Sequence, residues 1–92
     1  MDLDQVKKLF TPTDYERGME YYRQGRVTDM QCTKTDTEMD VSCTVRGSKR
    51  YTVRFTEMAE ERLRISCTCP RYADVGRCKH LAAAMIAYVG EP

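Results

Sequence analysis

Three cysteines and one histidine, gathered in residues 67–80, constrain this chain more than any other feature. They read Cys67-x-Cys69, then eight residues, then Cys78-x-His80, and they include the only histidine of the sequence. Four sulfur or nitrogen ligands in a tetrahedral arrangement are typical of structural zinc sites. The spacing therefore predicts one zinc ion held by these four residues, with no coordination position left open for a catalytic water.

The length of the chain gives such a site a structural purpose. A chain of 92 residues has a small core, and short domains are often stabilised by a metal or by disulfides. The cysteine count is five, an odd number, and residues 1–5 are polar, so a secreted disulfide scaffold is a poor match. The longest apolar run, 81–89, is about half the roughly 20 residues that span a bilayer. We therefore expect a cytoplasmic protein without a membrane partner.

Residues 1–26 are expected to be helical. Asp2 suits the N-cap of a short first helix. Its apolar residues recur with a helical period at Leu3, Val6 and Phe10. Thr11 and Pro12 suit the N-cap and first position of a second helix, which we expect to run to about Gln24.

Residues 27–66 change to a period of two, which predicts a four-stranded antiparallel sheet with one buried face. Turns are expected at Asp36-Thr37 and at 46–49, and an acidic break at 57–61 separates the last two strands. Cys32 and Cys43 fall at inward strand positions, where we expect core packing; a disulfide or additional metal ligation are the alternatives.

Residues 67–89 are expected to form a zinc loop followed by a helix. Pro70 turns the chain out of the sheet, because proline has no N–H to donate, and the following residues form a loop. The helix begins at Cys78, where the positive end of the helix dipole favours the thiolate, and its alanines at 82–84 leave room for close packing against the sheet. The whole chain, 1–92, is thus predicted to be one α+β domain: N-terminal helices, a four-stranded antiparallel sheet, and a C-terminal helix joined to the sheet by the zinc site.

Charge is distributed unevenly, although the net charge is only +1. Residues 1–45 hold 6 Lys/Arg and 9 Asp/Glu, a balance of −3, whereas residues 46–80 hold 9 and 4, a balance of +5. Cationic side chains beside an aromatic ring are suited to phosphate contact and base stacking. The candidate nucleic-acid contacts lie in two groups. Around the zinc loop they are Arg71, Tyr72, Arg77 and Lys79, and at polar-face positions of the last two strands they are Arg50, Arg54, Arg62 and Arg64. A protein partner is the alternative.

A catalytic role for the same residues is a further alternative. Cys78 and His80 could act as nucleophile and base, and Cys67 and Cys69 as a redox pair. No orienting carboxylate accompanies them, and zinc would occupy the thiols. We therefore expect a binding module that is not an enzyme and has no small-molecule substrate.

The segment from Cys67 to Ala83 resembles the SWIM zinc finger, whose signature is C-x-C-xn-C-x-H. The residues around the ligands also resemble those common in that family: Cys69-Pro70 and Cys78-Lys79-His80-Leu81-Ala82-Ala83. Residues 15–18 and 21–27 resemble the segment before the finger in bacterial proteins that carry a Swi/Snf-class helicase-like ATPase. The resemblance implies one structural zinc, DNA or protein binding, and possible attachment to such an ATPase in the same chain. No G-x-x-x-x-G-K-[ST] phosphate loop is present, so we expect a piece of a longer protein, with a small independent protein as the alternative.

Overall fold

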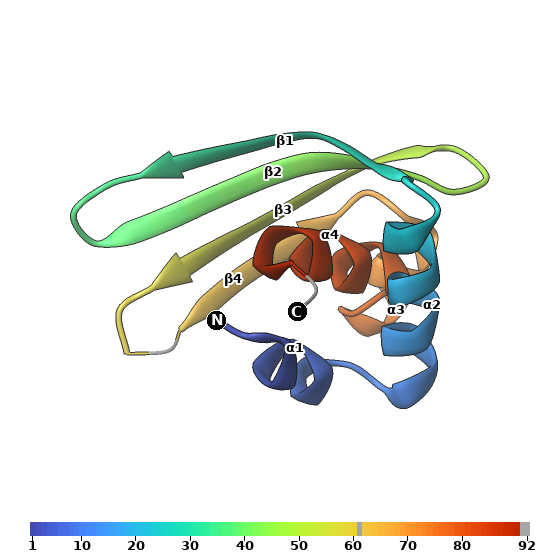
Figure 1. The fold of residues 1–92 in the computed structure, drawn as a ribbon, viewed down its shortest axis with the longest axis horizontal. Coiled ribbons are helices and arrows are strands. Elements are labelled where there is room, and N and C mark those ends of the chain that lie inside the picture. The colour runs from blue at the N-terminus through green and yellow to red at the C-terminus, as the bar shows by residue number, and fades with distance from the viewer. Residues whose placement is uncertain (61, 91–92) are drawn as a thin grey trace.

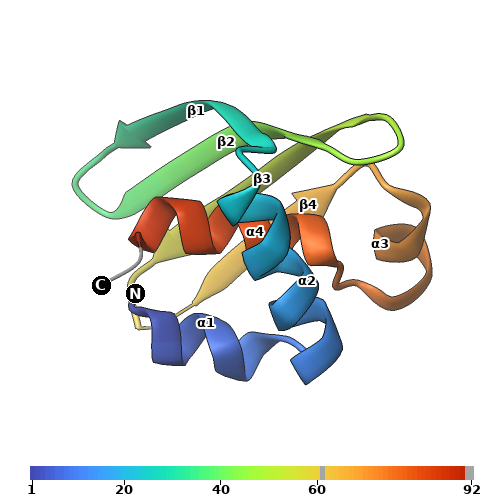
Figure 2. The same cartoon turned by 45° about the vertical axis from the view of Figure 1, so that its right-hand side comes forward.

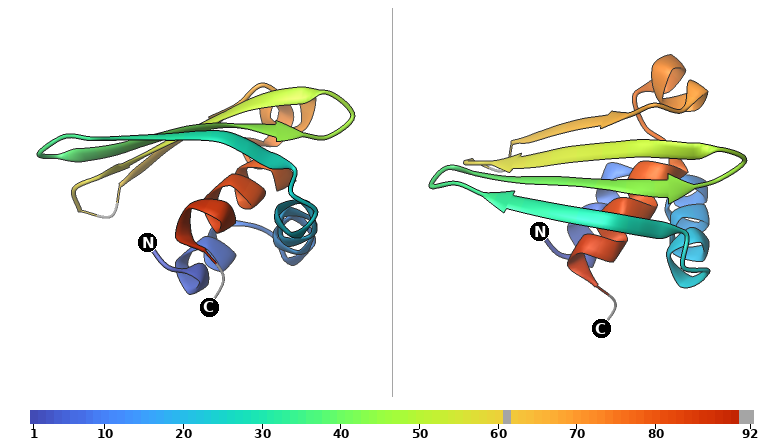
Figure 3. Two further views of the ribbon diagram at one scale, coloured as in Figure 1. Left: turned by 45° about the horizontal axis from the view of Figure 1, so that its top comes forward. Right: turned by 90° about the horizontal axis from the view of Figure 1, so that it is seen from above.

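A computed structural model of the chain describes residues 1–60 and 62–90. Four antiparallel strands form one sheet in the order β1-β2-β3-β4, and the helices lie on one face of it (Figures 1 and 3). The strands are β1 (Val27–Lys34), β2 (Glu38–Arg46), β3 (Arg50–Met58) and β4 (Leu63–Cys67). The helices are α1 (Leu3–Leu9), α2 (Pro12–Arg23), α3 (Pro70–Val75) and α4 (Lys79–Val89). The predicted α+β fold is confirmed.

Both N-terminal helices begin where the capping residues predict. Asp2 and Gln5 form a capping box, in which each side chain accepts a hydrogen bond from the backbone N–H of the other residue. At the start of α2, the Thr11 hydroxyl accepts a hydrogen bond from the N–H of Asp14, and Pro12 occupies the first helical position. These local bonds fix the angle at which the chain enters α2, and so help to place that helix beside the end of the sheet.

The β2–β3 hairpin is the longest paired element of the sheet. Its register runs from Glu38 opposite Met58 to Arg46 opposite Arg50. Strand β3 continues to Met58, so Glu57 lies within a strand and the break between the last two strands begins later than the predicted 57–61. The last residue of that predicted break, Glu61, lies outside the described residues. Strand pairing supplies the backbone of Glu57 with partners, and this outweighs the weak strand preference of a charged residue.

Strand β1 contains a bulge, and one sequence prediction fails beside it. The register shifts by one residue between Thr28 and Gln31, and Asp29 has a positive φ of 55°. Beyond the bulge, Cys32 pairs with Val41 and so faces the same side as the core, but its side chain is exposed. The prediction that Cys32 packs in the core is therefore wrong. It lies on an outer strand of the sheet, whereas Cys43, on the central strand β2, is buried as expected.

Helix α4 forms the centre of the core. It lies between the sheet and the N-terminal helices (Figure 2), and its residues from His80 to Ile86 are buried. On the sheet side, Tyr88 meets Phe55 of β3 edge to face, with ring centroids 5.4 Å apart. On the other side, α2 approaches so closely that a Cβ added to Gly18 would lie 2.6 Å from the Cβ of Ala82. The small side chains of α4 therefore serve packing against α2, in addition to the sheet packing that the sequence predicted.

Among the described residues, no helix combines the length and the apolar content needed to cross a bilayer.

Candidate metal centre

Cys67, Cys69, Cys78 and His80 come together in the folded chain. Their candidate ligand atoms all lie within 4.8 Å of one another, and all four residues are buried. Four ligands bound tetrahedrally at about 2.3 Å would be separated from one another by roughly 3.8 Å. The upper limit of 4.8 Å exceeds this separation by about 1 Å, so the four atoms would enter the coordination shell if the cluster contracted by that amount.

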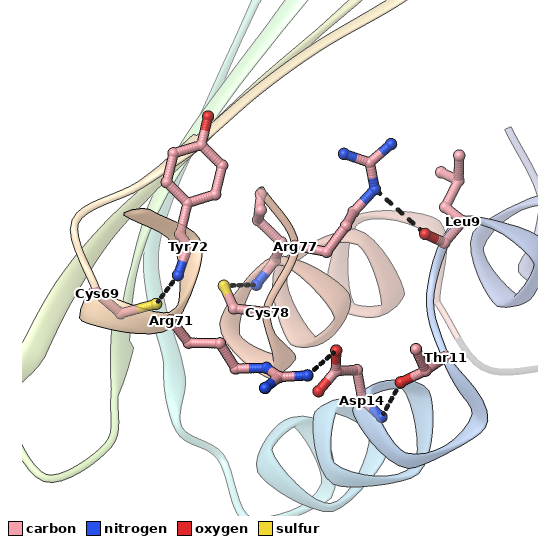
Figure 4. Close-up of polar contacts among 9 residues, drawn as sticks. Leu9, Thr11, Asp14, Cys69, Arg71, Tyr72, Arg77 and Cys78 are labelled. Atoms are coloured by element: carbon pink, nitrogen blue, oxygen red, sulfur yellow. Dashed lines mark hydrogen bonds and ion pairs between the residues drawn. The ribbon is translucent and has the colours of Figure 1, made fainter. Parts of the chain in front are cut away.

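Three different elements position these side chains. Cys67 is the last residue of β4, Cys69 caps α3, and Cys78 caps α4, with His80 in the first turn of that helix. The N–H of Tyr72 donates a hydrogen bond to Cys69 Sγ at 3.4 Å, and the N–H of Leu81 donates to Cys78 Sγ at 3.5 Å (Figure 4). Both sulfurs are therefore oriented by helix N-termini, as an N-cap oxygen would be.

The loop predicted between the two ligand pairs contains a helix. Residues Pro70–Val75 form α3, which ends at Gly76 in the left-handed conformation (φ 74°). The signal was present in the sequence, because Cys69-Pro70 repeats the cap-then-proline pattern of Thr11-Pro12. The Tyr72 hydroxyl donates a hydrogen bond to the Ile65 carbonyl at 2.8 Å and so holds α3 against β4. The segment between the ligands is consequently an ordered part of the site.

His80 carries the observation that best tests whether a metal fits. Its Nδ1 is buried and has no hydrogen-bond partner among the described residues. A buried polar atom without a partner costs free energy of about 1–3 kcal/mol, and a metal ion bound at this nitrogen would remove that cost. The donor set of three sulfurs and one imidazole nitrogen also matches the preference of zinc. The buried cluster is consistent with one zinc ion.

Aromatic rings and a glycine enclose the imidazole on its remaining sides. The His80 ring centroid lies 4.5 Å from that of Tyr51 and 5.7 Å from that of Tyr21. A Cβ added to Gly47, in the β2–β3 turn, would lie 3.0 Å from His80 Nε2. The turn thus rests directly on a candidate ligand, and only a residue without a side chain fits there without displacing a neighbour.

The thiols of the cluster influence one another strongly. A hydrogen bond with the Cys67 side chain is the largest cause that raises the pKa of Cys78 to about 12, and burial raises it further. His80 and the N–H of Leu81 act in the opposite direction, but their combined effect is smaller. The N–H of Leu81 at the helix N-terminus thus favours the Cys78 thiolate, as the sequence predicted, but in the metal-free cluster the neighbouring thiol and burial outweigh it. A coordinated cation would reverse this balance.

Comparison with known families agrees with this geometry. Residues 61–89 match the family model of the SWIM zinc finger. The matched segment contains all four residues of the cluster. A search of curated proteins and a search of solved structures each gave no match. This segment of the chain is thus similar to the SWIM zinc finger, and the similarity includes the four candidate metal ligands.

The four predicted nucleic-acid contacts of the zinc loop lie around the cluster, but their side chains differ in the contacts that they already make within the protein. Arg71 pairs with the buried carboxylate of Asp14 at 3.2 Å, and its side chain remains 55% exposed (Figure 4). Arg77 donates hydrogen bonds to the carbonyls of Leu9 and Gly76. The Lys79 ammonium lies 5.2 Å from the centre of the Tyr21 ring. Tyr72 is half-buried, and its hydroxyl is engaged as described above.

Arg62 and Arg64 lie apart from those four residues. Arg62 immediately precedes β4 and Arg64 is its second residue, whereas Cys67 is its last, and both arginine side chains are exposed. The Arg64 guanidinium lies 3.8 Å from Met58 Sδ, near the β3–β4 turn. Arg50 and Arg54 are exposed on β3, where Arg54 pairs with Asp40 at 3.3 Å. The structure therefore does not gather all eight candidates on one surface.

Sequence reasoning missed residues from other segments that border the site. A hollow of about 240 Å³ beside the cluster is lined by Cys69, Cys78 and His80 together with three cationic side chains, those of Arg17, Arg71 and Lys79. Arg17 belongs to α2, in the half of the sequence whose balance is acidic. Charge counted along the chain could not reveal it, because only the close approach of α2 and α4 brings Arg17 to the metal centre.

Proposed function

We propose that this chain is a nucleic-acid-binding module, with DNA as its ligand, whose fold depends on one structural zinc ion. Cys67, Cys69, Cys78 and His80 would hold the ion, and all four coordination positions would be filled by protein. The ion would supply cross-linking rather than activation of a water molecule. The observation that carries the metal assignment is the buried, unpartnered Nδ1 of His80 among three thiols.

The cross-link would join parts of the chain that a small core holds only weakly. Cys67 ends the sheet, Cys69 begins α3, and Cys78 and His80 begin α4. Because the β2–β3 turn rests on His80 through Gly47, the same ligand also supports the central hairpin. Loss of the ion would therefore loosen the sheet and α4 together, since binding energy at such a site contributes directly to folding.

Cationic side chains above the cluster support nucleic acid as the ligand. Arg17, Arg71 and Lys79 line one hollow. Among the described residues, Asp14 is the one acidic group in its lining, and it is already paired with Arg71. Zinc with three thiolates would carry a net charge of about −1. The four ligand residues are buried, so the charge exposed in the hollow would still be that of the cationic side chains. Arg77 and the ring of Tyr72 lie nearby, and Arg62 and Arg64 offer a second, separate contact. Guanidinium and ammonium groups are the usual donors to backbone phosphates.

The resemblance of residues 15–18 and 21–27 to segments that precede SWIM fingers in helicase-like proteins suggests the cellular setting of the module. We propose that the module is cytoplasmic and helps a Swi/Snf-class ATPase to engage DNA. Co-purification with such an ATPase, or its occurrence in the same reading frame, tests this setting separately from DNA binding itself.

A protein-interaction adaptor is the second candidate. A groove of about 490 Å³ between α1 and the β3–β4 turn is lined by Met1, Leu9, Met58 and Leu63 among other residues, and Met1 is 37% exposed. The same lining carries both charges, on Lys8, Arg62 and Glu57, so the groove suits the mixed surface of a protein better than a phosphate.

Two measurements test the proposed function. Metal analysis of the purified, reduced protein should give one zinc per chain, and strong chelation should lower the thermal midpoint and the helical circular dichroism. Titration of a labelled DNA oligonucleotide at low salt should show binding that weakens steeply as salt rises. A chain that contains no zinc refutes the metal assignment, and an absence of DNA binding at low salt refutes the nucleic-acid assignment in favour of the adaptor.

A further inference from the structure

The β2–β3 hairpin places two arginines directly opposite each other. Arg46 and Arg50 are cross-strand partners at the end of the hairpin, and both side chains are exposed. Like charges at directly opposite positions destabilise a sheet. No ion pair to either guanidinium is found within residues 1–60 and 62–90. An arrangement of this kind has an unfavourable energy in the isolated domain, and an anion bound between the two groups would relieve it.

A groove on the outer face of the sheet lies at this pair. It has a volume of about 430 Å³. Its lining includes both arginines and three threonines, from strands β1, β2 and β3: Thr28, Thr44 and Thr52. Hydroxyl groups and guanidinium groups are the donors that proteins use for phosphate oxygens. Asp29 is the single acidic residue in the lining, and it is positioned by the bulge.

Further cations extend from this groove toward the metal centre. The Arg26 guanidinium donates a hydrogen bond to the Arg46 carbonyl at 3.1 Å and lies 4.8 Å from the centre of the Tyr21 ring. Lys79 lies 5.2 Å from the same ring. Tyr51 lines both the outer groove and the hollow beside the cluster. Figure 1 shows that the β2–β3 turn, the end of α2 and helix α3 all lie at one end of the molecule.

We propose that the groove between Arg46 and Arg50 binds a backbone phosphate of nucleic acid, and that the same strand continues past Tyr51 to Lys79. This proposal rests on the proposed function and assigns it a surface that includes the outer face of the sheet. Cations spread from the groove to the metal centre suit a polyanion with several phosphates better than one small anion. Because Gly47 lies between the two arginines in sequence and rests on His80, the metal centre would hold the hairpin in its binding position.

The test compares two double variants with equal loss of charge. Arg46→Gln/Arg50→Gln removes the paired guanidiniums, and Lys7→Gln/Lys8→Gln removes two exposed cations of α1. Fluorescence anisotropy with labelled single-stranded and double-stranded DNA gives affinity as a function of salt. The arginine variant should lose on the order of tenfold in affinity at low salt, and its salt slope on duplex DNA should shrink by about 0.9 for each lost phosphate contact. The lysine variant should bind as the unaltered protein does.

Each result has a distinct meaning, provided that zinc content and thermal midpoint match the unaltered protein. If the unaltered protein binds DNA but the arginine variant binds equally well, the surface is wrong and the proposed function stands. If both double variants lose affinity equally, the effect is one of net charge and the groove is not the site. If polyglutamate of matched charge displaces DNA as well as unlabelled DNA does, the groove recognises acidic peptide, which also overturns the proposal. If no variant binds DNA, the proposed function itself fails.

Discussion

Replacing Gly18 by alanine sets two physical effects against each other, and the structure decides which is larger. Gly18 lies inside α2, where alanine is favoured over glycine by about 0.8–1.0 kcal/mol. If helix propensity alone mattered, the substitution would stabilise the protein. The added Cβ, however, would lie 2.6 Å from Ala82 Cβ and 2.8 Å from the backbone nitrogen of Ala83.

Neither neighbour can rotate away, because one is a Cβ and the other belongs to the backbone of α4. The two helices must therefore move apart, and overpacking of this kind costs about 1–3 kcal/mol. Subtracting the gain in propensity leaves a net destabilisation of roughly 0–2 kcal/mol, with a central value of about 1 kcal/mol. For a domain of this size, each kcal/mol lowers the thermal midpoint by about 4–8 °C.

Thermal unfolding of the zinc-loaded protein, followed by circular dichroism, measures the result. The pair Glu20→Ala and Glu20→Gly provides the matched control, because Glu20 is exposed on the same helix and reports the propensity difference without packing. We expect Gly18→Ala to unfold at a lower temperature than the unaltered protein. A midpoint that rises by as much as the Glu20 pair predicts would refute the close approach of α2 and α4.

The remaining predictions concern single side chains around the sheet and the metal centre. Iodoacetamide at pH 8 should modify the exposed Cys32 in the zinc-loaded protein and leave Cys43 unmodified. Burial, with a smaller effect of Cys32, raises the pKa of Cys43 to about 11 and keeps this thiol protonated. Peptide mapping that finds Cys43 labelled would contradict this prediction. Arg71→Met should destabilise the fold by about 1 kcal/mol, because the buried Asp14 carboxylate loses its ion-pair partner. The loss is limited to this size because solvent already screens the exposed Arg71 side chain. Equal urea midpoints for the variant and the unaltered protein would show that the ion pair does not contribute to stability. Gly47→Ala should weaken zinc affinity by about tenfold, measured by competition with a chelator, because its Cβ crowds His80. Lys49→Ala, an exposed position in the same turn, should leave the affinity unchanged.

Much of this fold is predictable because local signals and burial agree. The caps of α1 and α2, the alternation of β2 and β3, and the buried face of α4 all follow from short-range patterns that the tertiary structure reinforces. The metal cluster is predictable for a related reason. Cys67 and Cys69 flank the end of a strand, and Cys78 and His80 flank the start of a helix, so two local geometries suffice to bring the pairs together.

The features that escaped prediction depend on contacts between distant segments. Cys32 shares the inward side of the sheet with Val41, yet only the position of its strand at the edge shows that nothing covers it. Arg17 and Arg26 belong to an acidic half of the sequence. Arg17 joins the cationic end because α2 packs on α4, and Arg26 joins it through hydrogen bonds with the backbone of Arg46. The pKa of Cys78 reflects a second thiol, Cys67, whose distance no spacing rule provides.

The bulge in β1 has a consequence for how this strand can tolerate changes in length. Val27 and Cys32 are separated by an odd number of positions, so a regular strand would point them in opposite directions, yet their partners Val45 and Val41 are both buried. The extra residue between Thr28 and Gln31 restores the agreement. Deleting Asp29 would therefore leave every flanking side chain on its present side of β1, whereas deletion of a residue from the uninterrupted strands β2 or β3 would invert the side chains beyond it.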